Sequence, residues 1–206
     1  MNGDTERVVE DLIARAEGKT RFLVAIAGPP GSGKSTFVEQ LSQALRARGE
    51  QAAIVPMDGF HLDDAVLREK GLLERKGAPE TFDVRGFVDI VRALQDADDE
   101  VFVPVFDRSR ELAVAAARSV SPRHRFVLVE GNYLLLDQSP WTRLAGLLDV
   151  SIMLEASPDV LRHRLMERWR ALGLSEEAAR AKVMENDMPN GELVQSRIRR
   201  ADITLS

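Results

Sequence analysis

The sequence predicts an α/β fold in which a parallel sheet is flanked by helices in three layers. Apolar runs of strand length alternate along the chain with segments whose apolar residues recur at helical spacing. The first unit consists of a strand at Arg21 to Ala27, a glycine-rich turn, a helix at Lys34 to Arg48 and a second strand at Gln51 to Met57. This order implies parallel strands joined by a right-handed crossover. With 206 residues, the chain is expected to form one domain over residues 1–206.

Composition and charge exclude several classes of protein. The hydrophobic fraction of 44% and the charged fraction of 30% are ordinary for a soluble globular protein. A formal net charge of -5 gives no basic surface for nucleic acid, which is therefore not an expected partner. The chain has no cysteine, so disulfides and thiolate metal sites are excluded. The acidic segment Met1 to Glu17 lacks the features of a signal peptide, and no apolar run could span a membrane. A cytoplasmic location without membrane contact is expected, and a homodimer is compatible with the sequence.

The middle of the chain is predicted from apolar spacing and turn residues. Helices are expected up to Gly18, at Leu62 to Lys70 and at Val84 to Leu94. The stretch Gly71 to Phe82, which contains a glycine and a proline, is expected to be a loop or a mobile flap. Pro104 favours an edge position for the strand that contains it, and the segment Val101 to Val120 fits an antiparallel ribbon extending from the sheet.

The second half is predicted in the same way. Strands are expected at Phe126 to Glu130, Val150 to Leu154 and Ala201 to Leu205, and helices at Trp141 to Leu148, after Pro158 and from Ser175 through Val183. The run Asn186 to Gly191 is expected to break the chain before a last short helix. A small lid is expected over about residues 162–190.

The glycine-rich turn fits the phosphate-binding pattern G-x-x-x-x-G-K-[S/T]. It consists of Gly28, Pro29, Pro30, Gly31, Ser32, Gly33, Lys34, Ser35 and Thr36. Glycines let several backbone N–H groups point at one anion, and the N-terminus of the following helix adds partial positive charge. Lys34 would hold the outer phosphates of ATP, and the Ser35 hydroxyl would be a ligand of Mg²⁺. The alternative, a glycine-rich turn that binds nothing, is disfavoured by the strand before it and the helix after it.

Two carboxylates follow predicted strands, at the edge of the sheet where ligands bind in open α/β folds. Asp58 comes directly after the second strand, where it would accept a proton from an attacking hydroxyl or support Mg²⁺. Its alternative role is to cap the helix that follows. Glu130 ends the strand Phe126 to Glu130, as a Walker B carboxylate near magnesium does. His61 would contact a substrate or fill a turn.

Two further groups of polar side chains have a functional and a solvated interpretation. Lys76, Glu80 and Asp83 gather near the turn in the expected flap. The helix after Pro158 carries Arg162, Arg164, Arg168 and Arg170, of which Arg164 and Arg168 share one face. Arginines bind phosphoryl oxygens and neutralise charge that develops during transfer, or they pair with nearby acids on a solvated face.

Together these residues point to phosphoryl transfer, which needs anion binding, magnesium, a base and cations. The sequence has no N-K-x-D guanine motif, no L-S-G-G-Q transporter motif and no second phosphate loop. A small-molecule kinase is therefore favoured over a GTPase switch or a transport ATPase.

Six motifs resemble one superfamily. The blocks GPPGSGKST, PMDGFH, KGAPETFD, PVFDRS, VLVEGNYLL and ENDMPN occur in this order between Phe22 and Leu205. They resemble the uridine kinase, phosphoribulokinase and bacterial pantothenate kinase superfamily, and within it the kinases associated with bacterial fructose transport systems. The resemblance implies a three-layer P-loop NTPase fold that uses ATP and Mg²⁺.

The resemblance also implies roles for single residues. Asp58 would be the general base, Glu130 would lie near magnesium, and Arg164 and Arg168 would be lid arginines. Substrate contacts are implied for His61, Glu80, Asp83 and Arg108, and a contact with the nucleotide base for Asn190. The histidine that follows the P-x-Y-D block of uridine kinases is absent, and the flap differs from that of pantothenate kinases.

The function predicted from these features is transfer of the ATP γ-phosphoryl group to a hydroxyl of a small metabolite. A sugar such as fructose is the first candidate acceptor, followed by a uridine-like nucleoside or a pantothenate-like alcohol, because fold and motifs do not fix the acceptor. A hypothesis from another class is an ATP-binding regulatory module that acts on a partner protein. A kinase directed at RNA or DNA is disfavoured by the acidic balance.

Overall fold

A five-stranded parallel sheet forms the centre of the protein. The computed structural model describes residues 3–96 and 98–206. The strand order is β2-β5-β1-β6-β7, with bounds β1 Phe22–Ala27, β2 Ala52–Pro56, β5 Phe126–Gly131, β6 Val150–Leu154 and β7 Ile203–Leu205. All four neighbouring pairs are parallel, which confirms the predicted α/β class and the short closing strand.

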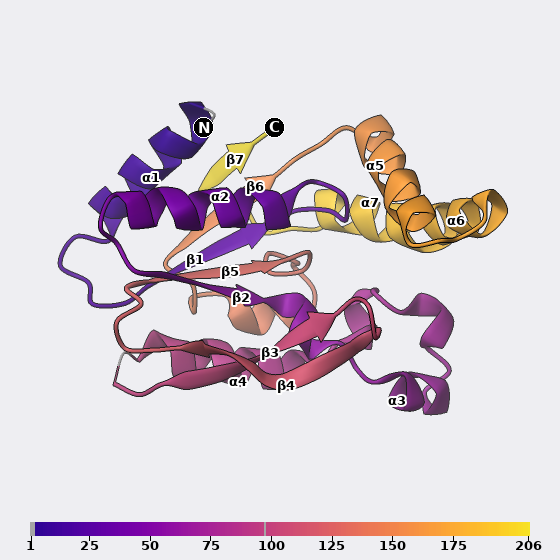
Figure 1. Cartoon of the computed structure of the whole chain (residues 1–206), viewed down its shortest axis with the longest axis horizontal. Coiled ribbons are helices and arrows are strands. Elements are labelled where there is room, and N and C mark those ends of the chain that lie inside the picture. The colour runs from indigo at the N-terminus through magenta and orange to yellow at the C-terminus, as the bar shows by residue number, and fades with distance from the viewer. Residues whose placement is uncertain (1–2, 97) are drawn as a thin grey trace.

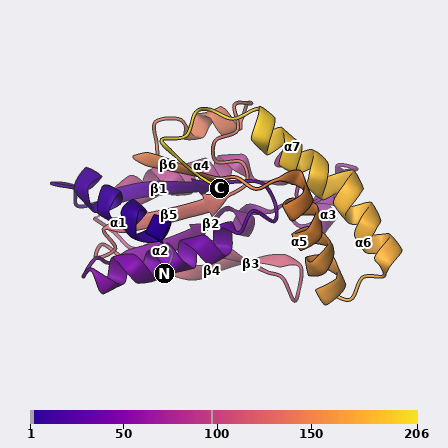
Figure 2. The ribbon, with the colours of Figure 1, turned by 90° about the horizontal axis from the view of Figure 1, so that it is seen from above.

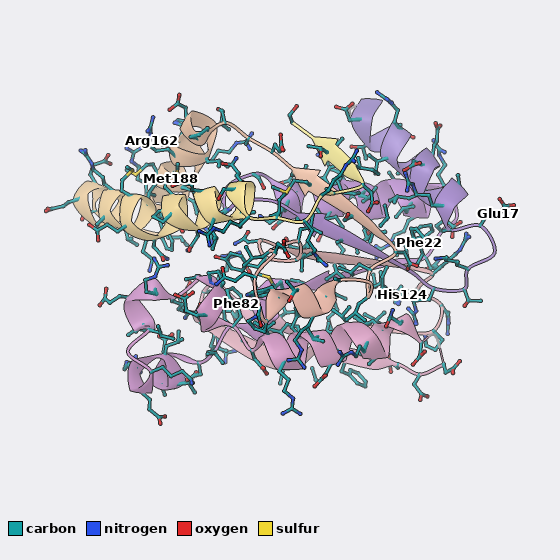
Figure 3. All side chains as sticks on the ribbon, turned by 180° about the vertical axis from the view of Figure 1, so that it is seen from behind. Glu17, Phe22, Phe82, His124, Arg162 and Met188 are labelled. Carbon is teal, nitrogen blue, oxygen red and sulfur yellow. The ribbon has the colours of Figure 1, made fainter. Side chains whose placement is uncertain are left out.

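Helices cover both faces of this sheet and complete three layers (Figure 1). On one face lie α1 (Gly3–Arg15) and α2 (Lys34–Ala47), whose apolar residues pack on alternate positions of the strands, such as Val24 and Ile26. On the other face, α4 (Val84–Gln95) packs on the intervening positions, such as Leu23 and Ala25. Side chains fill both gaps between the layers (Figure 3), and as a result each residue of β1 is buried.

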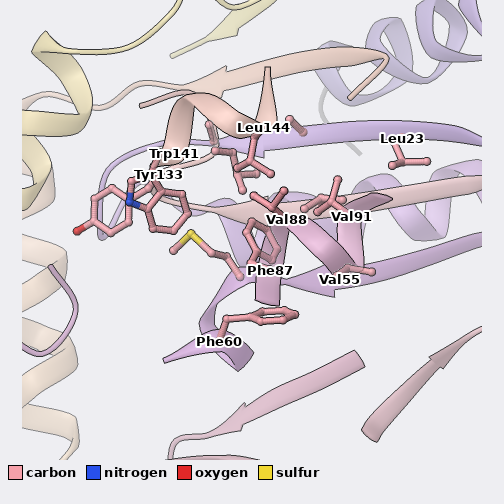
Figure 4. Close-up of a cluster of buried hydrophobic side chains, with 14 of the residues drawn as sticks. Leu23, Val55, Phe60, Phe87, Val88, Val91, Tyr133, Trp141 and Leu144 are labelled. Carbon is pink, nitrogen blue, oxygen red and sulfur yellow. The ribbon is translucent and has the colours of Figure 1, made fainter. Parts of the chain in front are cut away.

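The core beneath α4 is aromatic and supports the site described below. Trp141 lies among Phe82, Phe87 and Tyr133, with ring centroids 5.3–6.3 Å apart (Figure 4). Trp141 begins the 3-10 turn η4 (Trp141–Leu144), so the helix predicted at Trp141 to Leu148 is shorter than expected. Phe60, which follows β2, and Tyr133, which follows β5, belong to this core, so the core holds the segments after both strands in place.

The predicted antiparallel ribbon is confirmed and is separate from the main sheet. Within the described part of the chain, strands β3 (Val101–Asp107) and β4 (Leu112–Val120) pair only with each other, with a register irregularity between Val103 and Val105. The edge position that Pro104 predicts is therefore taken in a two-stranded ribbon. The ribbon packs on the 3-10 turn η1 (Met57–Phe60) that follows β2, where the absence of a side chain at Gly59 lets the Pro104 backbone approach.

The segment expected to be a mobile flap is folded against its surroundings. It follows α3 (Asp64–Glu69) and contains the 3-10 turns η2 (Leu73–Arg75) and η3 (Pro79–Thr81). The Tyr133 hydroxyl donates to the Gly77 carbonyl at 2.6 Å, and Asn186 Nδ2 donates to the Lys76 carbonyl at 2.9 Å. These two bonds hold the flap backbone to the segment after β5 and to the lid.

The expected lid consists of helices at the carboxyl ends of the strands (Figure 2). It comprises α5 (Pro158–Ala171), α6 (Glu176–Lys182), the π-helical turn η5 (Val183–Asp187) and α7 (Met188–Ser196). The helix break predicted at Asn186 to Gly191 is wrong, since the chain stays helical from Glu176 to Ser196. Met188 N–H donates to the Val183 carbonyl, five residues back, and this wider turn comes directly before Pro189, which has no N–H to donate.

Candidate active site

The glycine-rich loop joins β1 to α2 and leaves the N-terminus of that helix open. Gly31 and Gly33 adopt φ values of 80° and 97°, the left-handed region that glycine occupies without strain. Gly33 is the N-cap of α2, and no side chain caps the helix there. The first N–H groups of α2 are thus free for an anion, and the Ser32 hydroxyl is buried without a hydrogen-bond partner among the described residues.

Lys34 is held beneath this loop. Its side chain is only 8% exposed and Nζ donates to the Pro29 carbonyl at 2.9 Å. Burial lowers the pKa of Lys34 to about 8, against the raising effect of Glu130 and Asp58. A phosphate would restore the charge that burial disfavours, which fits the predicted role in holding phosphates.

A hollow of about 220 Å³ opens in front of the loop, and we refer to it as the loop hollow. It is lined by the loop residues Pro30, Gly31, Gly33, Lys34, Ser35 and Thr36, together with Asp58, Arg108, Glu130, Gly131, Asn132 and Arg168. The sheet topology explains this set, because β1, β2 and β5 are neighbours and end at the same edge.

Glu130 faces Lys34 and Asp58 across this hollow. Burial, with a smaller contribution from the Asp58 charge, raises the pKa of Glu130 to about 7, against the lowering effect of Lys34 and Arg108. Two carboxylates and a hydroxyl, Ser35, therefore line one hollow. Within residues 3–96 and 98–206, no three His, Asp or Glu side chains cluster as a metal site. This donor set suits Mg²⁺, which takes one or two carboxylates and completes its shell with phosphates and water.

A second hollow of about 100 Å³ lies between the flap, the ribbon and the lid, and we refer to it as the flap hollow. Asp58, Arg108 and Arg168 line both hollows. Arg108, in the ribbon turn, donates to Asp58 Oδ2 at 2.8 Å. The cap of α3 is Asp63, so the alternative that Asp58 caps this helix is wrong. Asp58 is left where the two hollows meet.

His61 forms part of the wall of the flap hollow. Its ring packs against those of Phe82 and Phe106 at a tilt of 43°, with centroids 4.1 and 4.7 Å away. Nδ1 lies 2.8 Å from the Asp58 carbonyl, which can only accept a hydrogen bond, so Nδ1 carries the proton. Burial lowers the pKa of His61, and the neutral ring keeps an unprotonated Nε2 as its remaining polar atom.

The two predicted lid arginines have different surroundings. Arg164 donates to the Gly31 and Ser32 carbonyls at 3.2 and 3.3 Å, so it braces the outer side of the loop. Arg168 lines both hollows, and burial lowers its pKa. Only Arg168 therefore faces the space between the hollows, although one helix face carries both side chains.

Two predicted residues lie elsewhere than expected. Asp83 caps α4, accepting from Gly86 N–H at 2.9 Å, and Glu80 is exposed beside Arg75, with 3.7 Å between their nearest charged atoms. Neither residue lines the flap hollow. Asn190 is buried in the wall of the flap hollow and donates to Asn186 at 3.3 Å, and its contact with the nucleotide base stays a prediction.

Sequence reasoning missed several residues of the flap hollow. They are Phe106, Asn132, Trp169, Lys182 and Asp187, whereas Lys76 is among the polar side chains of the expected flap. Lys76 Nζ donates to Asp64 at 2.8 Å and to the Glu111 carbonyl at 2.9 Å, joining the flap to the ribbon turn. Lys76, Phe106 and Asn132 lie within the motif blocks of the sequence, and this membership could have marked them as site residues. Lys182 lies outside these blocks, so no sequence pattern marks it.

Comparison with known proteins identifies the family in which this arrangement occurs. The model of the phosphoribulokinase / uridine kinase family matches residues 23–205. The chain belongs to this family. The predicted resemblance is confirmed, and the protein is a small-molecule kinase of an ATP-using family with a P-loop fold.

Similar proteins cover nearly the whole chain. The Escherichia coli (strain K12) protein YggC, which is uncharacterised, is 38% identical over 185 residues, or 89% of this chain and 76% of YggC. The Schizosaccharomyces pombe protein C227.14, provisionally named a uridine kinase, is 37% identical over 195 residues, or 90% of this chain and 83% of that protein. A crystal structure from Silicibacter sp. TM1040, provisionally named a fructose transport system kinase, has 43% identity and a TM-score of 0.94 over 100% of both chains. No helix among the described residues has the length and apolar character to cross a membrane.

Proposed function

We propose that the protein transfers the γ-phosphoryl group of ATP to a hydroxyl of a small metabolite, with a sugar such as fructose as the first candidate acceptor. The observation that carries this proposal is that Asp58, Arg108 and Arg168 line both the loop hollow and the flap hollow. A phosphoryl group passing from one hollow to the other would cross between a carboxylate and two cations. The name of the Silicibacter structure supports a sugar, and the name of the Schizosaccharomyces protein supports a nucleoside as the alternative.

The loop hollow suits the phosphates of ATP. The open N-terminus of α2, Lys34 and the unpartnered Ser32 hydroxyl supply donors and positive charge. Ser35 and Glu130 would hold Mg²⁺, which neutralises phosphate charge when bound. Arg164, on the loop carbonyls, would position the loop while Arg168 meets the transferred group.

The flap hollow suits the acceptor. The acceptor hydroxyl gives its proton to the Asp58 carboxylate, its oxygen forms the new bond to the γ-phosphorus, and the bond to the bridging oxygen of ADP breaks. Arg108 holds the Asp58 carboxylate in place at 2.8 Å. His61 Nε2 accepts a hydrogen bond from a further hydroxyl of the acceptor.

An acceptor screen tests this function. Sugars, nucleosides and pantothenate are incubated with ATP and Mg²⁺, and phosphorylated product is detected by mass. We expect one class to give product with the wild type and none with Asp58→Asn. Tight ATP binding without product from any acceptor would contradict a kinase and favour a regulatory module that acts on a partner protein.

A further inference from the structure

The flap hollow contains four cationic side chains, which differ in how their charge is balanced. Lys76 pairs with Asp64 at 2.8 Å and Glu111 at 3.5 Å, and Arg108 pairs with Asp58 at 2.8 Å. Arg168 and Lys182 form no ion pair with the residues that the structure describes. Two of the four charges are thus available to a ligand.

These two cations flank one aromatic side chain. The Arg168 guanidinium lies 5.5 Å and Lys182 Nζ 5.4 Å from the Trp169 ring centroid. Trp169 is itself fixed, because Nε1 donates to Asp187 Oδ2 at 2.6 Å. Both cations are therefore held by a rigid indole and not by a carboxylate.

Two acids lie near Lys182, and each is bonded to another side chain. Asp187 accepts a hydrogen bond from the Trp169 N–H, and the other nearby acid, Asp64, accepts from Lys76 Nζ at 2.8 Å, so among the described residues neither forms an ion pair with Lys182. The Lys182 ammonium keeps a net positive charge on this side of the flap hollow. A concave site with an unbalanced cation favours a ligand of opposite charge.

The two free cations have different positions. Arg168 lines both hollows and is available to the phosphoryl group that ATP supplies. Lys182 lines only the flap hollow, so its charge is available to the acceptor itself. Lys182 ends α6, which lies across from α3 at the end of the molecule opposite the termini (Figure 1).

We propose that the acceptor carries an anionic group, a carboxylate or a phosphate, which Lys182 binds in the flap hollow. This inference rests on the proposed kinase function and narrows its acceptor to a hydroxylated acid or a sugar phosphate. The neutral sugar then lacks the group that Lys182 recognises. The hydroxyl that reacts points to Asp58, while the anionic group points to the Trp169–Lys182 side.

Matched acceptor pairs test the inference. Each pair has one neutral and one anionic member: glycerol and glycerate, glucose and gluconate, panthenol and pantothenate, fructose and fructose 6-phosphate, uridine and uridine 5′-monophosphate. We expect the wild type to prefer one anionic member over its neutral partner by about tenfold or more in kcat/KM, as a hydrogen bond to a charged group implies. The carboxylates and phosphates form separate arms, which identify the anion.

Lys182 variants show whether this residue provides the preference. Lys182→Met retains the apolar stem against Trp169 and should raise KM for the anionic acceptor about tenfold with little change for its neutral partner. Lys182→Arg should keep the preference, and Lys70→Met, at an exposed lysine outside the hollow, is the matched control. A neutral acceptor that is preferred, or an equal loss for both members of a pair, would overturn the anionic acceptor and leave the kinase intact. Absence of product from every pair would overturn the kinase function itself.

Discussion

Arg108 in the ribbon turn donates to the Asp58 carboxylate that follows β2, at 2.8 Å. The two residues are 50 positions apart in the chain. Asp58 is 26% and Arg108 48% exposed, so water screens the pair and it contributes little to stability. The role of this ion pair is to position Asp58, the proposed base, where the two hollows meet.

The first prediction separates catalysis from nucleotide binding. Asp58→Asn keeps the size of the side chain but removes the proton acceptor, so turnover should fall at least a hundredfold. ATP affinity should change less than threefold, because the loop donors are untouched. Product formation is measured by mass and ATP binding by calorimetry. Near-normal turnover would show that Asp58 is not the base.

The second prediction concerns the partner of that base. Arg108→Gln should lower kcat by about tenfold or more while the free energy of unfolding changes by less than about 1 kcal/mol, as for exposed ion pairs. Arg110→Gln, in the same turn but paired with Asp107 and outside both hollows, is the control. Equal effects of the two substitutions on kcat would contradict a specific role for Arg108.

The third prediction uses the raised pKa of Glu130. Its folded-state pKa is about 7 against an ordinary value of 4.5, so its contribution to stability is present below pH 4.5 and is lost as pH rises through 7. Lys34, with a pKa of about 8, stays protonated over most of this range. Denaturation without nucleotide should therefore show a component of stability that falls between pH 5 and 7, and Glu130→Gln should remove it.

The pH dependence of Mg²⁺ binding tests the protonation of Glu130 independently. If Glu130 holds Mg²⁺, binding must displace its proton, so Mg²⁺ affinity in the presence of ATP should rise with pH up to about 7. Calorimetry in two buffers of different ionisation enthalpy measures the released protons. An unchanged proton release in Glu130→Gln would exclude this carboxyl as the source.

The fourth prediction concerns the link between flap and lid. Asn186 is 4% exposed, and its side chain bonds to the Lys76 carbonyl, Arg75 and Asn190. Asn186→Ala leaves the Lys76 carbonyl without its donor and should cost about 1–3 kcal/mol of stability. It should also raise KM for the acceptor more than KM for ATP, because the flap lines only the flap hollow. Equal changes in the two KM values would indicate that the substitution disturbs the whole site and not the flap alone.

The sequence predicts the nucleotide side of this site better than the acceptor side. Lys34 and Asp58 follow β1 and β2, and Glu130 lies at the end of β5. They come together because the parallel topology places these strand ends at one edge. The strand and motif patterns of the sequence are therefore enough to predict that these three residues lie together. The antiparallel ribbon is also local, since its two strands are joined by a short turn.

The flap hollow depends on contacts between distant segments, which local patterns do not encode. Asn186 lies in the wider turn η5 and donates to the flap at the Lys76 carbonyl. The sequence predicts a helix break over Asn186 to Gly191, so it does not place Asn186 in a continuous helix. Asp83 ends the block KGAPETFD but caps α4, so a residue type that is common in active sites has a structural role here. Lys182 and Trp169 meet only because α5 and α6 pack together.

The last prediction concerns the glycine that follows Asp58. A Cβ at Gly59 would lie 2.3 Å from the Pro104 carbonyl oxygen and 2.6 Å from its carbon, both backbone atoms of the ribbon. Gly59→Ala should therefore push the ribbon outward, with a loss of about 1–3 kcal/mol of stability, as for overpacked cores. Gly3→Ala, at a helical glycine whose added Cβ would have no described atom within 4 Å, is the matched control.

The displaced ribbon should also affect the reaction, because Arg108 lies in its turn. We expect kcat of Gly59→Ala to fall by a factor similar to that of Arg108→Gln, and the double variant to lose little more than either single variant, since both act on one contact. Unfolding by urea and turnover measured on the same preparations separate the two effects. Multiplicative losses in the double variant would show that Gly59 acts on turnover by a route other than the Asp58–Arg108 pair.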